Sequence, residues 1–320
     1  MRASCVARAS QAVLDEVEPD DGRAVHHAAT GNRPPQAGLA GDRFRSRGVP
    51  LRSPPTLKAG NPQMHQDLQQ SKVPEVTLAF WFIKILATTL GETGGDAVSM
   101  SMDFGYALSS LIFIGIFGVA VIAQISTKAF HPLLYWLVVI ATTTAGTTIA
   151  DFADRSLGIG YPGGASALFV LLMVSLAVWY WSAGSISVST IVSPKIETFY
   201  WVAILFSQTL GTALGDWMAD TNGLGYEGGA LVFTAALAVI AAAYFWTGIS
   251  RTLLFWGAFI LTRPLGATLG DLLDKPLDEG GLAISRFYAT AILAALILAC
   301  VVFLPQRAGS HAGKADAAQS

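Results

Sequence analysis

Charged and hydroxylated side chains recur at every fourth position along four otherwise apolar segments. Steps of four place residues on one face of an α-helix, with a drift of about 40° per step. Each segment therefore predicts a helix with a polar stripe that ends in a carboxylate. The four stripes are Lys84, Thr88, Glu92 and Asp96; Val139, Thr143, Thr147 and Asp151; Ile204, Gln208, Thr212 and Asp216; and Phe259, Arg263, Ala267 and Asp271.

The side chains of these stripes indicate a particular chemistry. Carboxylate and hydroxyl oxygens suit hard cations such as Mg²⁺, Ca²⁺ or Mn²⁺, and also serve protons or Na⁺. A zinc or copper site is not expected, because the four stripes contain no histidine or cysteine. The residues expected to line a transport pathway or bind ions are Lys84, Thr88, Glu92, Asp96, Thr143, Thr147, Asp151, Gln208, Thr212, Asp216, Arg263 and Asp271. Within this set, the expected metal ligands are Glu92, Asp96, Asp151, Asp216 and Asp271.

Two cations lie in the middle of the predicted helices. Lys84 lies about 12 Å into its helix at 1.5 Å per residue, and Arg263 lies at a similar depth, followed by Pro264. An ionisable side chain near the bilayer centre costs at least ~2.5 kcal/mol and marks a functional site by default. Glu92, two turns beyond Lys84, is the expected partner of this lysine, either directly or through a neighbouring helix. The four aspartates are expected near helix C-termini, where the helix dipole disfavours negative charge, so they need a compensating partner.

The stripes belong to an internal repeat. Four tryptophans are each followed by glycine ten positions later and by aspartate five positions after that. The tryptophans are Trp81, Trp136, Trp201 and Trp256, and the glycines are Gly91, Gly146, Gly211 and Gly266. Small residues four positions apart let helices approach closely, so the pairs Gly91/Gly95, Gly146/Ala150, Gly211/Gly215 and Gly266/Gly270 predict helix contacts. The tryptophans are expected to be interfacial anchors at the cytoplasmic ends of their helices.

Apolar runs of about 20 residues, the length of a membrane-spanning helix, predict an all-α polytopic membrane protein. We expect eight spans, at 76–96, 106–126, 133–152, 165–186, 198–217, 229–249, 253–272 and 283–304. Each repeat contributes two spans and returns the chain to its starting side. The four repeats, at about 75–131, 132–196, 197–251 and 252–305, are therefore parallel and related by an axis along the membrane normal.

Composition excludes a conventional soluble enzyme. Apolar residues make up 52% of the 320 residues and charged residues only 13%, about half the usual charge of roughly 25%. The bundle contains no Ser/His pair, zinc motif or phosphate-binding glycine loop of the kind that enzymes use. The chain is therefore not expected to be an enzyme.

The repeated segments resemble a known family. Residues 84–96 (KILATTLGETGGD) and 208–216 (QTLGTALGD) are similar to bacterial inner-membrane proteins built of four tandem two-span repeats with a characteristic tryptophan, a repeat of unknown function. The resemblance covers roughly residues 72–305. It implies a fold and a location in the bacterial inner membrane, and it implies no activity.

The distribution of charge predicts the orientation. Lys128, Lys195 and Arg251 follow the even-numbered spans, and Lys72 and Arg307 flank the bundle. By the positive-inside rule this side is cytoplasmic, and both termini are inside. The opposite side carries three bases and eleven acids, a field that attracts cations unless the acids are simply solvated.

The two ends of the chain differ from the bundle. Residues 1–70 hold 9 of the 20 basic residues and no apolar run of the length of a signal peptide. They are expected to be a disordered tail or an extension upstream of a true start at Met64. Residues 306–320 are expected to be a disordered cytoplasmic tail.

Two functions remain open. The leading hypothesis is a permease for a small cation (a proton, Na⁺ or a hard divalent metal such as Mn²⁺ or Mg²⁺), with an aspartate ring at the outer mouth and Lys84 and Glu92 as a relay. The alternative is a non-transporting structural or stress-associated scaffold whose intramembrane charges only fix helix packing. The expected partners are the lipid bilayer and a small cation, and no nucleic acid. No cofactor is identified, although a hard cation could be bound.

Overall fold

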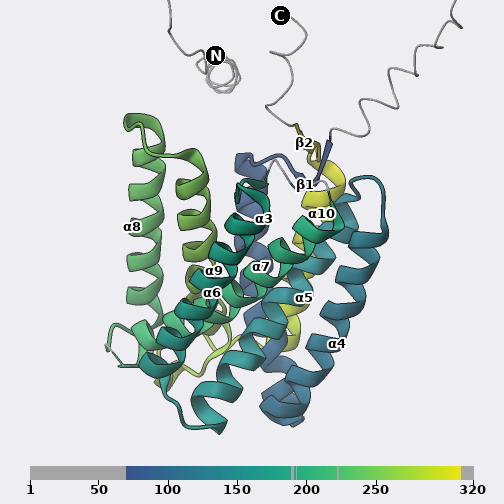
Figure 1. Cartoon of the computed structure of the whole chain (residues 1–320). Coiled ribbons are helices and arrows are strands. Elements are labelled where there is room, and N and C mark those ends of the chain that lie inside the picture. Colours follow the sequence, from purple (N-terminus) through teal and green to yellow (C-terminus); the bar gives the residue numbers. More distant parts are fainter. Residues whose placement is uncertain (1–69, 189–190, 192, 222, 311–320) are drawn as a thin grey trace, which may run out of the picture. The chain divides into compact units, whose positions relative to one another are not determined.

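The computed structural model describes residues 70–310 apart from 189–190, 192 and 222. The predicted N-terminal tail, the alternative start at Met64 and most of the predicted C-terminal tail lie outside the described residues. Eight long α-helices make up most of the described chain (Figure 1). They are α3 (Leu78–Asp96), α4 (Gly105–Ser126), α5 (Pro132–Asp151), α6 (Tyr161–Ala183), α7 (Pro194–Asp216), α8 (Gly225–Trp246), α9 (Arg251–Asp274) and α10 (Arg286–Phe303).

The helix boundaries agree with the predicted spans to within a few residues. The largest difference is a start four residues earlier than predicted, which is found at α7 and also at α6 and α8. Gly160 and Gly225 precede or open α6 and α8 with positive φ angles of 74° and 66°, a conformation that glycine adopts without strain. The glycine pairs Gly163-Gly164 and Gly228-Gly229 are therefore part of the first turns of α6 and α8.

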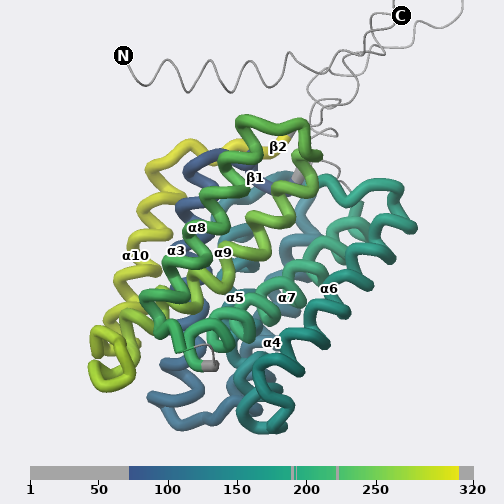
Figure 2. Tube along the Cα trace, turned by 90° about the vertical axis from the view of Figure 1, so that its left-hand side faces the viewer, coloured from purple at the N-terminus to yellow at the C-terminus, as the bar shows by residue number. Residues whose placement is uncertain are grey.

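Four inner helices form a closed ring (Figure 2). α3 packs on α5, α5 on α7, α7 on α9, and α9 back on α3. Each outer helix packs on the inner helix of the next repeat: α4 on α5, α6 on α7, α8 on α9, and α10 on α3. This cyclic order is the arrangement expected for parallel repeats around one axis.

Six of the described helices are long and apolar enough to cross a membrane. The outer helices α4, α6, α8 and α10 are the most apolar, with only 17–28% of their spanning windows buried, whereas α5 is 72% buried and α9 61%. The inner helices α3 and α7 do not qualify as candidate spans. Their buried polar residues, including Lys84 and Glu92 in α3 and Gln208 in α7, lower their hydropathy.

The repeated glycines bring neighbouring inner helices into close contact. A Cβ atom on Gly91 would collide with Thr143, and one on Gly146 with Gln208. In the same way Gly211 lies against Arg263, and Gly266 lies against Thr88. Each glycine therefore packs on the second stripe residue of the next repeat, which is the close approach that the small-residue pairs predict.

The four aspartates lie near the C-termini of the inner α-helices, as predicted, and a π-helical turn follows three of them. α3, α5 and α7 continue past Asp96, Asp151 and Asp216 as one π-helical turn each, η1 (Ala97–Ser101), η2 (Phe152–Ser156) and η4 (Trp217–Thr221). In the fourth repeat, α9 continues to Asp274 and the short η5 (Leu277–Glu279) follows. The first three aspartates thus lie at a change of helical pitch, a feature frequent at functional sites.

A small sheet joins the two ends of the bundle, and it corrects the prediction of a disordered tail for the described residues 306–310. β1 (Gln70–Pro74) pairs antiparallel with β2 (Ala308–Ser310). The ammonium of Lys72 in β1 bonds the carboxylate of Glu197 at 2.8 Å and the carbonyl of Ile125 at 2.9 Å. These contacts tie the sheet to α7 and α4.

Candidate functional site

The four polar stripes face one buried axis between α3, α5, α7 and α9. All sixteen stripe residues are at most 3% exposed, and they stack in four layers. The first layer is Lys84, Val139, Ile204 and Phe259; the second is Thr88, Thr143, Gln208 and Arg263; the third is Glu92, Thr147, Thr212 and Ala267; and the fourth is Asp96, Asp151, Asp216 and Asp271.

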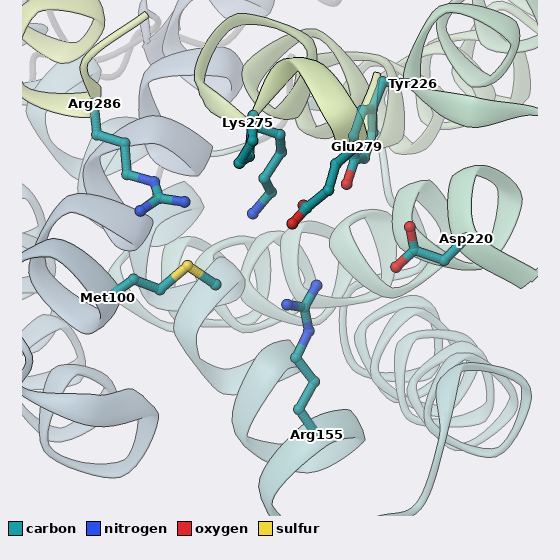
Figure 3. A pocket seen from close by; sticks show the side chains of 8 residues that line it. Met100, Arg155, Asp220, Tyr226, Lys275, Glu279 and Arg286 are labelled. Atoms are coloured by element: carbon teal, nitrogen blue, oxygen red, sulfur yellow. The ribbon is translucent and has the colours of Figure 1, made fainter. Parts of the chain in front are cut away.

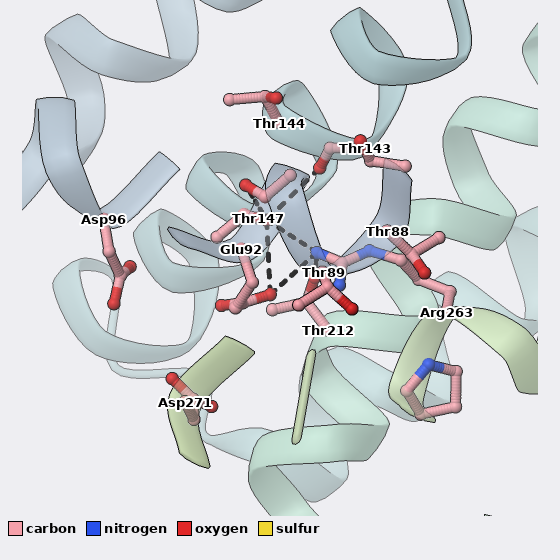
Figure 4. A network of polar contacts seen from close by, with 12 residues as sticks. Thr88, Thr89, Glu92, Asp96, Thr143, Thr144, Thr147, Thr212, Arg263 and Asp271 are labelled. Carbon is pink, nitrogen blue, oxygen red and sulfur yellow. Dashed lines mark hydrogen bonds and ion pairs between the residues drawn. The ribbon is translucent and has the colours of Figure 1, made fainter. Parts of the chain in front are cut away.

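Arg263 connects all four repeats at the centre of the axis (Figure 4). Its Nη2 donates to Glu92 Oε2 at 2.9 Å, to Thr147 Oγ1 at 2.6 Å and to Thr212 Oγ1 at 2.5 Å. One carboxylate and two hydroxyls, one from each of the other three repeats, therefore surround a single nitrogen. The oxygens of the third layer thus surround the guanidinium of Arg263, which occupies the centre of this layer.

The predicted pairing of Lys84 with Glu92 is wrong. Lys84 Nζ makes no hydrogen bond to a described residue and lies 3.8 Å from the centroid of the Phe259 ring. Glu92 lies eight residues further along the same helix, about 12 Å away along its axis. Arg263 reaches the carboxylate of Glu92 from the neighbouring helix α9 and takes the place expected for Lys84.

Two bases clamp the fourth layer in pairs. Arg155 bonds Asp151 at 3.0 Å and Asp216 at 3.4 Å, and Lys275 bonds Asp96 at 2.7 Å and Asp271 at 3.1 Å. The two clamps are related by a shift of 120 positions, which is two repeats. Asp151 and Arg155 correspond to Asp271 and Lys275, 120 positions later, and Asp216 corresponds to Asp96, 120 positions earlier. The ion pairs therefore follow a twofold relation within the fourfold arrangement.

The third and fourth layers bring carboxylates together in two groups. Carboxylate oxygens of Glu92, Asp216 and Asp271 lie within 4.8 Å of one another, as do those of Asp96, Asp271 and Asp274. Buried carboxylates at this spacing suit a hard cation. Four of the five predicted metal ligands fall in these groups. Asp151 falls in neither, and Asp274 is an additional candidate that lies outside the stripes.

A vestibule lies beyond the fourth layer. It has a volume of about 550 Å³, and its lining contains one residue from each repeat, four positions after each aspartate. These residues are Met100, Arg155, Asp220 and Lys275. Arg286 and Glu279 complete the polar lining, and the three bases point into the pocket from different sides (Figure 3). Extending each stripe by one further step of four would have predicted this fifth layer.

Six of the eleven acids on this side are buried in the bundle, and the other five are exposed, namely Asp103, Asp220, Glu227, Asp278 and Glu279. Asp154 and Asp274 are 6% and 7% exposed, and the four aspartates of the fourth layer are less exposed still.

Lys275 follows α9 and faces the same carboxylates. Burial works to lower the pKa of Lys275, but the charges of Asp271 and Asp96 outweigh it, so the pKa is raised above 10.5 and the lysine is charged at neutral pH.

Aromatic rings close the opposite end of the axis. The residue before each repeated tryptophan packs on the tryptophan of the next repeat, with centroid separations of 5.5 Å for Phe80–Trp136, 5.6 Å for Tyr135–Trp201, 6.5 Å for Tyr200–Trp256 and 5.8 Å for Phe255–Trp81. The hydroxyls of Tyr135 and Tyr200 also hydrogen bond to each other at 2.7 Å.

The prediction that the tryptophans are interfacial anchors is therefore corrected for three of them. Trp136, Trp201 and Trp256 are at most 3% exposed, because each packs into this aromatic layer. Trp81 is only partly buried. The spacing of the tryptophans along the sequence indicates the repeat correctly, but it does not distinguish a side chain that faces lipid from one that faces the axis.

Apolar outer helices around a polar, buried axis define a multi-pass helical membrane protein built of internal repeats. The sequence matches the Repeat of Unknown Function (DUF347) at residues 79–130, 134–185, 199–250 and 254–306, and the chain belongs to this family. The four matches confirm the four predicted repeats. Comparison with curated proteins and with solved structures gave no match.

Proposed function

We propose that the protein is a permease of the bacterial inner membrane that carries a small hard cation along its axis. Glu92, Asp216 and Asp271 form the central cation site, and Asp96, Asp271 and Asp274 form the site nearest the vestibule. The observation that supports this proposal is the convergence of carboxylates from three repeats within 4.8 Å on a buried axis. Three carboxylates favour a divalent ion such as Mn²⁺ or Mg²⁺ over Na⁺ or a proton.

Each end of the axis has a role in this proposal. The vestibule, whose lining contains three bases and two acids, leads to Asp271, which both carboxylate groups share. The aromatic layer around Tyr135 and Tyr200 closes the other end and must open for passage. Arg263, Arg155 and Lys275 neutralise the carboxylates while no ion is bound, and each must be displaced from a carboxylate for the ion to bind.

The topology of the proposal is eight spans with both termini in the cytoplasm. α3 and α7 are included because they are the repeat equivalents of α5 and α9, which are candidate spans in their own right. Lys128, Lys195 and Arg251 follow the even-numbered helices at the end of the bundle that carries β1 and β2. This concentration of bases favours that end as the cytoplasmic one.

A scaffold without transport is the second candidate, and one observation favours it. Every aspartate of the fourth layer has a base within 3.4 Å, so the charges are also consistent with fixed helix register. An enzyme is not proposed. The one histidine among the described residues, His131, caps the N-terminus of α5, whereas the fourth layer lies at the C-terminal end of that helix.

Flux into proteoliposomes tests the proposal against the scaffold. Vesicles that contain the full chain are loaded with a Mn²⁺-quenched dye, and Mn²⁺ entry is followed for the wild type, Glu92→Gln, Asp96→Asn and Asp103→Asn. Asp103 is exposed and serves as the control for a lost carboxylate. We expect flux with the wild type and Asp103→Asn and little flux with the other two. Equal flux in all four proteins, or none above empty vesicles in any, would contradict the permease.

A further inference from the structure

In the first and second layers, between the third layer and the aromatic layer, the axis contains buried polar atoms that make no hydrogen bond to the described residues. They are Lys84 Nζ, Gln208 Oε1, Gln208 Nε2, Arg263 Nε and Arg263 Nη1. All three side chains are 0% exposed. Leaving such groups without a partner costs about 1–3 kcal/mol each, and more when the group is charged.

These side chains occupy adjacent positions in the first two layers. Gln208 and Arg263 belong to the second layer, on the neighbouring helices α7 and α9, and Lys84 belongs to the first layer on α3. The ammonium of Lys84 lies over the ring of Phe259, which is one helical turn before Arg263 on α9. Helix α9 therefore lies between the other two helices and contacts both.

The unpaired atoms are nearly all donors. The lysine, the guanidinium and the amide nitrogen offer N–H groups, and the only unpaired acceptor among the three side chains is Gln208 Oε1. The neighbouring hydroxyls of Thr88 and Thr143 already donate to backbone carbonyls. The first two layers thus present several unpaired donors and few protein acceptors.

The region around Lys84 and Arg263 also has an excess of positive charge. Arg263 and a protonated Lys84 carry two positive charges, and among the described residues Glu92 is the only carboxylate that bonds either of them. One further negative charge would neutralise this region, and an uncompensated buried cation costs several kcal/mol. The aromatic layer adjacent to Phe259 offers π faces and no carboxylate to the lysine.

We infer that Lys84, Gln208 and the free edge of Arg263 form a binding site for a small monovalent anion of the size of chloride, bromide or nitrate. The anion accepts hydrogen bonds from Nζ, Nε2 and the guanidinium edge, and its charge balances the group. This site uses none of the carboxylates of the two acidic groups, and Arg263, which bonds Glu92, links it to the proposed cation site. If both sites exist, the bound anion also removes a positive barrier from the path of a cation.

The test uses the purified full chain in lipid nanodiscs. Its thermal unfolding midpoint is measured against increasing sodium chloride, with sodium gluconate at equal ionic strength as the reference salt. We expect chloride, bromide and nitrate to raise the midpoint with saturation in the wild type. In Lys84→Met the half-saturating chloride concentration rises about tenfold or more, the equivalent of ~1.4 kcal/mol. Lys128→Met removes an exposed lysine and keeps the wild-type response.

Gln208→Glu is the second variant, because it places a tethered carboxylate in the same layer. It is expected to unfold near the midpoint of the chloride-saturated wild type and to respond no further to chloride. A wild type that responds identically to chloride and gluconate contains only water at this site and overturns the inference. Full chloride responses in both Lys84→Met and Gln208→Glu would overturn it as well. Neither outcome depends on cation flux, so failure here is separable from failure of the permease.

Discussion

Arg263 and Glu92 form an ion pair of 2.9 Å across 171 positions of sequence, both buried at the centre of the repeat bundle. The arginine comes from the fourth repeat and the glutamate from the first, so the pair joins the last inner helix to the first and closes the ring. The same guanidinium nitrogen bonds Thr147 and Thr212. A single side chain therefore holds together residues of all four repeats.

Breaking this pair from one side should destabilise the bundle strongly. Arg263→Met leaves the Glu92 carboxylate buried without its cation, which costs roughly 3–5 kcal/mol. Glu92→Gln in the same chain should restore much of the loss, because the remaining groups are then neutral. Unfolding of the two single variants and the double variant in nanodiscs gives the coupling energy. Additive losses would show that the two side chains do not interact.

The repeated glycines should not tolerate even a methyl group. Gly211→Ala places a Cβ atom against the side chain of Arg263, and overpacking of this kind costs about 1–3 kcal/mol. Gly115→Ala is the matched control, because a Cβ there meets nothing within 4 Å and the substitution favours the helix by up to about 1 kcal/mol. Thermal unfolding midpoints should therefore shift in opposite directions. A shared direction would contradict the close contact at Gly211.

The sequence predicts the framework of this site well and its pairing poorly. Steps of four correctly place Lys84, Glu92 and Arg263 on one axis, because helical periodicity is local. Pairing depends on which helices become neighbours, and the cyclic order that brings α9 beside α3 is not a local property. Glu92 therefore pairs with Arg263 and not with Lys84. The tryptophans show the same limitation. Their spacing along the sequence is clear, but whether each side chain is buried depends on its packing against the next repeat.

The vestibule lining could have been predicted from the sequence by extending each polar stripe by four residues. Residues four positions after each aspartate continue the stripes, and they form the vestibule lining that includes Arg155 and Lys275. The π-helical turns after Asp96, Asp151 and Asp216 have no comparable signal, since they change the pitch without changing the residue types. The pairing of β1 with β2 joins segments more than 230 residues apart, beyond any local pattern.

The side chain of Lys275 should stay charged throughout the physiological pH range. Its pKa is raised above 10.5, so its contribution to stability is complete below that value and is lost only as the pH rises through the raised pKa. Lys275→Arg should therefore follow the wild type between about pH 6 and pH 9. Lys275→Met, which leaves Asp271 without its cation and Asp96 with only Arg286 at 3.8 Å, should lose about 3–5 kcal/mol.

Unfolding midpoints measured across this pH range check the Lys275 prediction. The wild type, Lys275→Arg and Lys275→Met are compared in the same lipid. A loss of stability in the wild type relative to Lys275→Arg between neutral pH and about pH 9 would mean that the lysine deprotonates there. The raised pKa would then be incorrect.

The tyrosine pair in the aromatic layer should behave as a unit. Tyr135 and Tyr200 share a hydrogen bond of 2.7 Å and are both fully buried. Removing one hydroxyl leaves the other without this bond, which costs about 1–3 kcal/mol, whereas Tyr135→Phe combined with Tyr200→Phe should cost less than the sum of the single losses. Urea or thermal unfolding of the three variants decides the point. Fully additive losses would argue against a direct bond.

Direct binding of Mn²⁺ tests the central claim, that carboxylates from three repeats form a cation site on the axis. The free-ion signal in electron paramagnetic resonance is titrated with the purified full chain in nanodiscs, for the wild type, Asp216→Asn, Asp271→Asn and the control Asp103→Asn. We predict saturable binding to the wild type and the control, and affinities about tenfold or more weaker, ~1.4 kcal/mol, for the two axis variants. Identical affinities in all four proteins, or no saturable binding to the wild type, would contradict the account.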